Sequence, residues 1–175
     1  MSTPPQPDTV CSIRSTTDPK DGTAACLMEW GPIEALVKPS AVLTTARDLA
    51  AAAAFAETDV ALLSVLRDEL QLDDSTLGFM MRDIRARRPI PPAPSVLRVH
   101  AVAGANTGLP YVHISRGSMK GELSPDEARE MAVQWTEAAV AAQIDVRLRY
   151  VLGEWGHLTA GDIDRLFTLL QGVQR

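Results

Sequence analysis

The sequence is poor in the residues and motifs on which enzymatic chemistry usually depends. Aromatic side chains make up only 5% of its 175 residues, and its two cysteines, Cys11 and Cys26, do not form a CxxC pair. Spacings such as GxSxG, HExxH, GxGxxG and GxxxxGK[ST], which mark nucleophiles, zinc sites and phosphate-binding loops, do not occur in it. These absences favour a non-catalytic protein over an enzyme, and we expect neither a cofactor nor a bound metal.

Long apolar runs and an excess of positive charge are also missing. The longest apolar run, Leu49–Ala56, is far shorter than the roughly 18 residues that a membrane-spanning helix needs. The N-terminus shows no apolar signal segment, so we expect a cytoplasmic protein in which Cys11 and Cys26 stay reduced. The formal net charge of −5 argues against broad binding to nucleic acid, which requires a basic surface. No contact with a membrane is expected.

The composition that remains is that of an ordinary globular protein. Hydrophobic residues make up 46% of the chain and charged residues 22%, and 175 residues suffice to build a hydrophobic core. Residues 1–26 are polar and contain many Pro, Ser and Thr, which predicts a disordered or loosely attached tail. Residues 27–175 are expected to form a single α+β domain that is predominantly helical.

This domain is expected to contain an internal repeat. Asp59–Ile84 aligns without gaps with Asp145–Leu170, 86 residues later, and apolar residues meet apolar residues at helical spacing. We interpret residues 27–88 and 96–175 as two pseudo-repeats, each containing a hairpin of a long and a short helix. The Pro-rich segment 88–95 would join them, because its prolines favour an extended chain.

Start and stop signals divide each repeat into two helices. The clearest start is Ser124, which is followed by Pro125 and two acidic residues. Asp59 and Asp145 occupy the same position in the two repeats, and we expect each of them to cap a helix or to face solvent at a bend. The four helices are expected to cover residues 40–70, 75–87, 124–152 and 159–173.

Between the linker and the second long helix the apolar period changes to two, which predicts an antiparallel β-hairpin over residues 96–115. Its strands would place His100 opposite His113, and we expect half-buried side chains there rather than a metal site. The next segment, SRGSMKG, is interpreted as a loop. Leu27–Val37 is expected to form one or two edge strands because Gly31-Pro32 interrupts it. A short antiparallel sheet would then pack with the helical hairpins.

The short helix of the first repeat ends in a group of arginines that could contact phosphate or nucleic acid: Arg82, Arg85, Arg87 and Arg88. Cations are also stabilising at any helix C-terminus, which is the simpler explanation. Residues 66–85 have the rhythm of a helix-turn-helix, and with the hairpin at 96–115 they loosely resemble winged-helix repressors over about fifty residues. A reading helix needs polar residues, however, whereas this one offers Gly78, Phe79 and Met80.

Phe79, Met80 and Met81 form an adaptable apolar group that could contact a protein partner, with a place in the core as the alternative. The long apolar helix stripes predict a non-catalytic interaction, regulatory or assembly protein that acts through protein–protein contacts. We expect a homo-oligomer formed through the Ala-rich helices or through Phe79–Met81. The alternative function is that of a winged-helix-like DNA-binding transcriptional regulator, which would use the helix at 75–88 and the hairpin at 96–115.

Overall fold

The computed structural model describes residues 11–89, 95–104 and 107–173. Its strands form two three-stranded antiparallel sheets, with the orders β1-β2-β3 and β4-β5-β6. The strands are β1 (Ser12–Thr17), β2 (Ala24–Trp30), β3 (Ile33–Val37), β4 (Arg98–Ala103), β5 (Pro110–Arg116) and β6 (Met119–Leu123). The helices are α1 (Pro39–Ser64), which continues into the π-helical turn η1 (Val65–Glu69), α2 (Asp74–Ala86), α3 (Pro125–Gly153) and α4 (Ala160–Val173).

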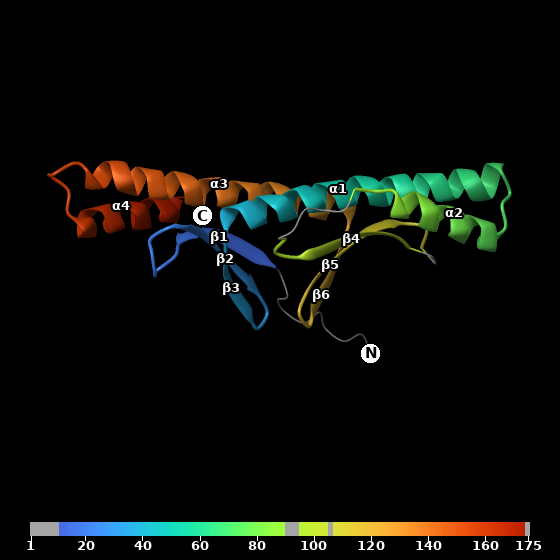
Figure 1. Ribbon diagram of the computed structural model, residues 1–175, viewed down its shortest axis with the longest axis horizontal. Coiled ribbons are helices and arrows are strands. Elements are labelled where there is room, and N and C mark those ends of the chain that lie inside the picture. The colour runs from blue at the N-terminus through green and yellow to red at the C-terminus, as the bar shows by residue number, and fades with distance from the viewer. Residues whose placement is uncertain (1–10, 90–94, 105–106, 174–175) are drawn as a thin grey trace.

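The helices form one layer along the long axis of the molecule, and the two sheets lie beneath its middle (Figure 1). α1 and α3 run in opposite directions side by side at the centre, and their C-terminal ends point to opposite ends of the molecule. α2 folds back along the end of α1, and α4 folds back along the end of α3. We term residues 54–87 the first arm and residues 140–173 the second arm.

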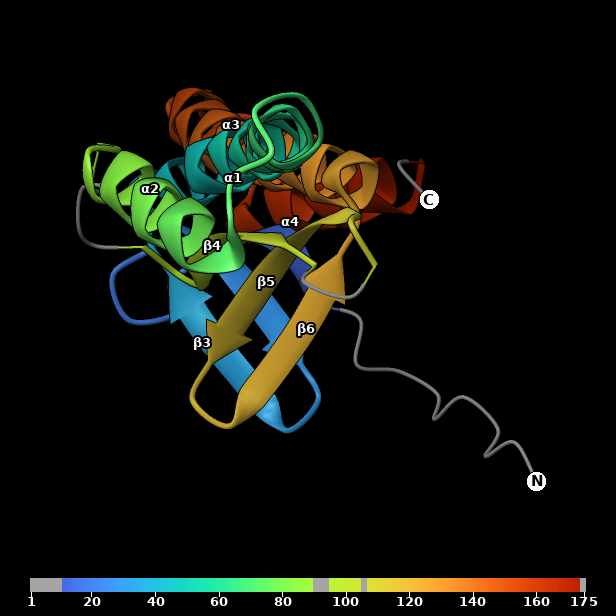
Figure 2. The ribbon, with the colours of Figure 1, turned by 90° about the vertical axis from the view of Figure 1, so that its right-hand side faces the viewer.

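This arrangement confirms the predicted α+β class with a predominance of helix. It corrects the prediction of one short sheet, because the strands form two separate sheets that face each other below the helix layer (Figure 2). The hairpin predicted at 96–115 is present as β4 and β5, and His100 does lie directly opposite His113.

Corresponding elements of the two halves are separated by a constant number of residues. Each strand of the second sheet begins and ends 86 residues after its counterpart in the first, as β4 (Arg98–Ala103) does relative to β1 (Ser12–Thr17). α1 and α3 also begin 86 residues apart, each at a proline, Pro39 and Pro125. The same spacing separates Gly31 and Gly117, which both adopt a left-handed backbone conformation in the turn before the third strand. The two halves therefore have the same order and lengths of strands.

Each long helix packs on the sheet of the other half. α1 lies chiefly against β4 and β5, whereas α3 lies chiefly against β1 and β2. The two helices also pack on each other through small buried side chains, Ala46 and Ala53 on α1 and Ala132 and Ala139 on α3, which permit a close approach. The result is one core that both halves share. Each long helix makes only minor contacts with the sheet of its own half.

The inner faces of the two sheets meet around a glycine. Trp30 of β2 and Ile114 of β5 are buried there. A Cβ atom on Gly121 of β6 would lie 3.2 Å from Cγ1 of Ile114 and 3.4 Å from Cζ2 of Trp30. Only a residue without a side chain fits between these two groups without moving them, so Gly121 sets how closely the sheets approach.

Buried polar contacts anchor the chain where it enters the second half. The backbone N–H of Val96 donates to Oγ1 of Thr45 at 2.7 Å, and the Thr45 hydroxyl donates to the carbonyl oxygen of Ala41 at 3.0 Å. Arg116 donates from Nη1 to the carbonyl oxygen of Val96 at 2.7 Å. Residues 90–94 of the predicted linker lie outside the described residues. The described end of the linker is thus fixed to α1 of the first half.

The helix starts follow local capping chemistry. Ser124 opens α3 with a full capping box, as the sequence predicts. The hydroxyl of Thr159 accepts the hydrogen bond that opens α4. Two other predicted starts move by a residue or two: α1 begins at Pro39 after Lys38, and the carboxylate of Asp73 caps α2. α1 also continues through Asp59 without the predicted bend, and its regular winding changes only at η1.

Three strands were misjudged from the sequence. Ser12–Thr17 forms β1, so the predicted tail over residues 1–26 is wrong for this part, while residues 1–10 lie outside the described residues. β2 is the central strand of its sheet and not an edge. The predicted loop SRGSMKG contains the turn into β6 and the first residues of that strand. β1 and β6 carry few large apolar residues, so their period-two pattern is weak, whereas β2 is apolar at nearly every position and shows no alternation.

The segment Pro39–Glu69, formed by α1 and η1, is long and apolar enough to cross a membrane by length and composition. Central helices of globular folds can meet the same criterion. Val42, Leu49 and Ala53 on α1 are fully buried in the shared core, so the apolar side of this helix already has a partner in the fold. Polar residues interrupt this segment, so the search for an uninterrupted apolar run did not identify it as a possible membrane span.

We expect Gly121→Val to lower the free energy of unfolding by about 1–3 kcal/mol, because the added atoms press against Ile114 and Trp30. Gly121→Ala should destabilise less. Gly78→Ala is the matched control, since a Cβ atom there meets nothing within 4 Å, and it should stabilise α2 by about 0.5–1 kcal/mol. Urea unfolding followed by circular dichroism measures all three, and equal effects at the two glycines would contradict the packing described.

Candidate functional site

A buried carboxylate holds the two helices of the first arm together. Asp59 on α1 is fully buried, and its Oδ2 accepts a hydrogen bond from Nε of Arg85 at 2.8 Å. Arg88 binds the same carboxylate with both Nη atoms, and its guanidinium also stacks 4.4 Å from the ring centroid of Phe55. This Asp59 clasp ties the end of α2 to the middle of α1. It corrects our expectation that Asp59 caps a helix or faces solvent.

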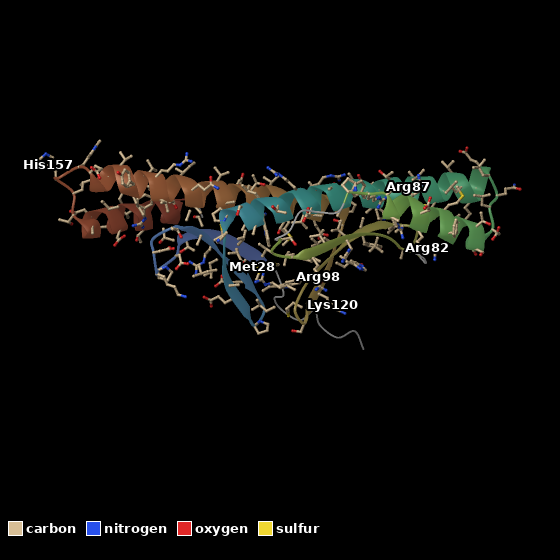
Figure 3. The ribbon with its side chains drawn as sticks, in the orientation of Figure 1. Met28, Arg82, Arg87, Arg98, Lys120 and His157 are labelled. Atoms are coloured by element: carbon tan, nitrogen blue, oxygen red, sulfur yellow. The ribbon has the colours of Figure 1, made fainter. Side chains whose placement is uncertain are left out.

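The clasp divides the arginine group predicted to contact phosphate. Arg85 and Arg88 are engaged with Asp59, whereas Arg87 pairs at the surface with Asp83 at 3.0 Å. Arg82 lies over the ring of Phe79, 5.3 Å from its centroid. Arg82 lies on α2 and Arg87 just beyond its end, both in the first arm (Figure 3). The structure therefore does not gather the four arginines into one phosphate-binding group.

The apolar group at 79–81 is also divided. Phe79 is 63% exposed and Met80 is partly exposed, as a partner-contact role requires. Met81 is only 3% exposed and packs with Leu66 and Leu77 between α1 and α2. Met81 therefore takes the place in the core that was the alternative for this group. The physical reason is the helical period, which turns residues 77 and 81 of α2 towards α1.

The reading helix and the wing of the predicted winged helix pack chiefly on other elements, although Ala103 and Thr107 of the hairpin line a pocket together with Arg67 of η1. α2 packs chiefly on α1 and η1, so the first arm is a two-helix hairpin. The hairpin of β4 and β5 is instead part of the second sheet, against which α1 packs. Residues 105 and 106, at the tip of the proposed wing, lie outside the described residues.

The outer face of the second sheet carries a shallow depression lined by polar residues. His100 and His113 lie side by side in it, and Nε2 of His113 is 2.8 Å from Oε2 of Glu122. Lys120 lines the same depression. Within the described part of the chain, no group of three or more His, Cys, Asp or Glu residues could hold a metal ion. The depression is open and its histidines are exposed, not half-buried as expected.

The cysteines are separate thiols in the structure, as the sequence predicts. Burial raises the pKa of the Cys26 thiol to about 11. Burial also raises the pKa of Cys11 to about 12, although the positive charge of Arg116 acts in the opposite direction. Both thiols are therefore protonated near neutral pH and are poor nucleophiles.

The second arm differs from the first in how its helices are joined. Asp145 corresponds to Asp59, but the residues at the positions of Arg85 and Arg88 are Gln171 and Gln174. α3 and α4 are connected instead by Arg149, whose Nη1 lies 2.5 Å from Oδ1 of Asp164 and whose guanidinium stacks on Phe167. Burial raises the pKa of Asp145, while the charge of Arg149 lowers it by a smaller amount.

The second arm also exposes far more apolar surface than the first. The first arm exposes a few large apolar side chains, namely Val65, Leu70, Phe79 and Met80. The second arm exposes such side chains along both of its helices and the turn between them, namely Val140, Ile144, Leu148, Tyr150, Val151, Trp155, Leu158, Leu166, Leu169 and Leu170. Its tip, marked by His157 in Figure 3, lies at the far end of the molecule from the first arm. The apolar surface is therefore concentrated at one end.

Four of these side chains form one line along α3, and Trp155, just beyond its end, continues the line; the successive spacings are four, four, three and four residues. We term this line the α3 stripe: Val140, Ile144, Leu148, Val151 and Trp155. At 3.6 residues per turn it lies on the opposite side of the helix from Arg149, which faces α4. Three of the five corresponding positions in the first half carry a smaller or a polar residue, namely Ala54, Thr58 and Glu69. The other two carry the same residues as the stripe, Leu62 and Val65. The stripe is thus specific to the second half, and the sequence analysis did not single it out.

Comparisons with known proteins do not identify a function, so the inference of a function rests on this geometry. The chain matches no protein-family model. Comparison with curated proteins and with solved structures also found no match.

We expect Asp59→Asn and Asp145→Asn to have opposite effects although the two positions correspond. Asp59→Asn should lower the free energy of unfolding at neutral pH by about 3 kcal/mol, because it removes the buried charge that Arg85 and Arg88 bind. Asp145→Asn should be neutral or slightly stabilising, because it removes an ionised group that burial disfavours.

The size of the second effect depends on pH. The raised pKa of Asp145 means that the folded state holds its proton more tightly, so the ionised carboxylate lowers stability above that pKa. Any gain from Asp145→Asn should therefore shrink as the pH falls through the folded pKa. Urea unfolding at neutral pH and at about pH 4 measures this. A large loss of stability in Asp145→Asn at neutral pH would contradict the contrast between the arms.

Proposed function

We propose that the protein is a non-catalytic interaction protein with a regulatory or assembly role, and that it acts through protein–protein contacts of its second arm. The observation that supports this most directly is the concentration of exposed large apolar side chains on that arm. Contiguous apolar patches on a protein surface are typical of interaction sites. Trp155, which is 61% exposed near the tip, is the residue type that most often anchors such contacts.

We also infer that the two halves are pseudo-repeats of one unit. The constant offset of 86 residues between corresponding strands and long helices supports this inference. Positions that both halves share, such as Ala53 and Ala139 in the helix crossing, then serve the common fold. Positions that are apolar in only one half need another explanation. A protein partner for the second arm accounts for them.

The arm also has a second apolar side. Ile163 and Phe167 of α4 face α3 and are buried, whereas Leu166, Leu169 and Leu170 of α4 remain exposed. Because α4 shows apolar residues beyond those needed to dock on α3, its outer side adds to the proposed contact surface. The proposed surface thus includes the α3 stripe and the outer side of α4.

Charge substitutions test the proposal. Val151→Glu and Leu169→Glu should each reduce the capture of specific partners by the tagged full-length chain by about tenfold or more, because a charge is placed in the apolar contact. Val65→Glu is the matched control, since Val65 corresponds to Val151 and is similarly exposed, 44% against 50%. Quantitative mass spectrometry of cross-linked captures from the source cells provides the measurement, after circular dichroism has shown that each variant is folded.

Two outcomes would contradict the proposal. One is a set of captured proteins that is unchanged in both second-arm variants. The other is specific retention of DNA that is lost on Arg82→Ala and Arg87→Ala and is insensitive to Val151→Glu and Leu169→Glu. That result would favour the DNA-binding regulator instead.

A further inference from the structure

The α3 stripe is an apolar helix face that no segment of the described chain covers. All five of its side chains are between about two-fifths and two-thirds exposed. The opposite side of α3 carries Met131, Trp135 and Ala139, which are buried in the shared core. The stripe therefore lies on the outside of the helix layer, where neither α4 nor the sheets obstruct it.

We propose that the α3 stripe binds the same stripe of a second copy of this chain, with the two helices antiparallel. This inference rests on the proposed function and names one partner for its surface. Ile144, Leu148, Val151 and Trp155 are spaced by four, three and four residues, which is the core spacing of a two-stranded coiled coil. Glu154 keeps right-handed helical backbone angles at the end of α3, so Trp155 extends the stripe.

An antiparallel second copy matches the stripe layer by layer. When Leu148 lies opposite Val151 of the second copy, Ile144 lies opposite Trp155 of the second copy, because four residues back on one helix correspond to four residues forward on the other. The two-fold axis then repeats both pairs. Each layer joins two apolar side chains, and the largest of them, Trp155, packs beside a medium-sized aliphatic group. The stripe is thus complementary in size to its own reversed copy.

The charges beside the stripe match in the same register. Arg147 and Glu154 lie on the same flank of the stripe, two turns apart, and both are exposed. In the antiparallel pairing Arg147 faces Glu154 of the second copy, and the symmetry produces this contact twice. Neither residue forms an ion pair with another residue of the described chain at the distances that define the other pairs. Both charges are therefore available to a partner.

The register centred between Leu148 and Val151 also suits the shape of the molecule. It keeps the two sheet-bearing bodies on opposite sides of the contact, since each body lies towards the N-terminal end of its own α3 (Figure 1). Because one helix per copy makes the contact, we expect a dimer that dissociates on dilution.

Sedimentation velocity of the full-length chain over a range of concentrations tests the inference. The native chain should shift from monomer to dimer as the concentration rises. Leu148→Glu should abolish the dimer, since it places two charges in the central layers. Lys120→Glu, an exposed charge reversal on the second sheet away from the stripe, is the matched control and should leave the dimer unchanged.

Charge exchange tests the register. Arg147→Glu and Glu154→Arg should each weaken the dimer by about fivefold to tenfold, because like charges then meet at both symmetric contacts. The double variant Arg147→Glu/Glu154→Arg should restore the native association, which a purely structural role of either residue would not produce. Circular dichroism on each variant confirms that the fold is intact.

A chain that remains monomeric at its highest soluble concentration would overturn this inference. A dimer that persists in folded Leu148→Glu, or a double variant weaker than both single variants, would also overturn it. These failures are distinguishable from failure of the proposed function: a strictly monomeric chain that still loses its captured partners in Val151→Glu and Leu169→Glu retains the proposed function without the dimer.

Discussion

The fold depends on the exchange of helices between its two halves. α1 covers the sheet of β4 and β5, and α3 covers the sheet of β1 and β2, so each sheet acquires its apolar cover from a segment far away in the sequence. The apolar inner faces of both sheets are removed from water only when the whole chain has folded. The contacts between the long helices and the sheets join residues far apart in the sequence, so the two halves depend on each other for their core.

The same exchange leaves the arms outside the shared core. Beyond the helix crossing, α2 contacts chiefly α1 and η1, and α4 contacts chiefly α3, so each arm must be stabilised by its own side chains. The first arm does this with the Asp59 clasp and the Leu66, Leu77 and Met81 cluster. The second arm uses Arg149 with Asp164 and Phe167. Different solutions are possible because changes in an arm do not disturb the crossing.

The features that were predicted correctly from the sequence are those that depend on residues close together in the chain. Helix periodicity, the cap at Ser124 and the hairpin that pairs His100 with His113 are confirmed, because each depends on neighbouring residues. The exchange of helices has no local signal, and β1 has only Ile13 as a large apolar residue, so both were missed. The Asp59 clasp left a trace that could have been used. An acid lies one turn beyond Ala56 on the apolar side of the first long helix, and Arg85 and Arg88 follow three residues apart at the end of the next helix and just beyond it.

The α3 stripe belongs to the proposed function and takes no part in the shared core. A helix that is apolar on one side needs one partner. α1 satisfies this rule because its buried residues face the core while exposed residues such as Thr58 lie on the outer side. α3 is apolar on two opposite sides along its C-terminal half. The described residues supply a partner for one side only, through the core and α4. Since an unpartnered apolar helix face lowers solubility without stabilising the monomer, the second partner is best sought outside the chain.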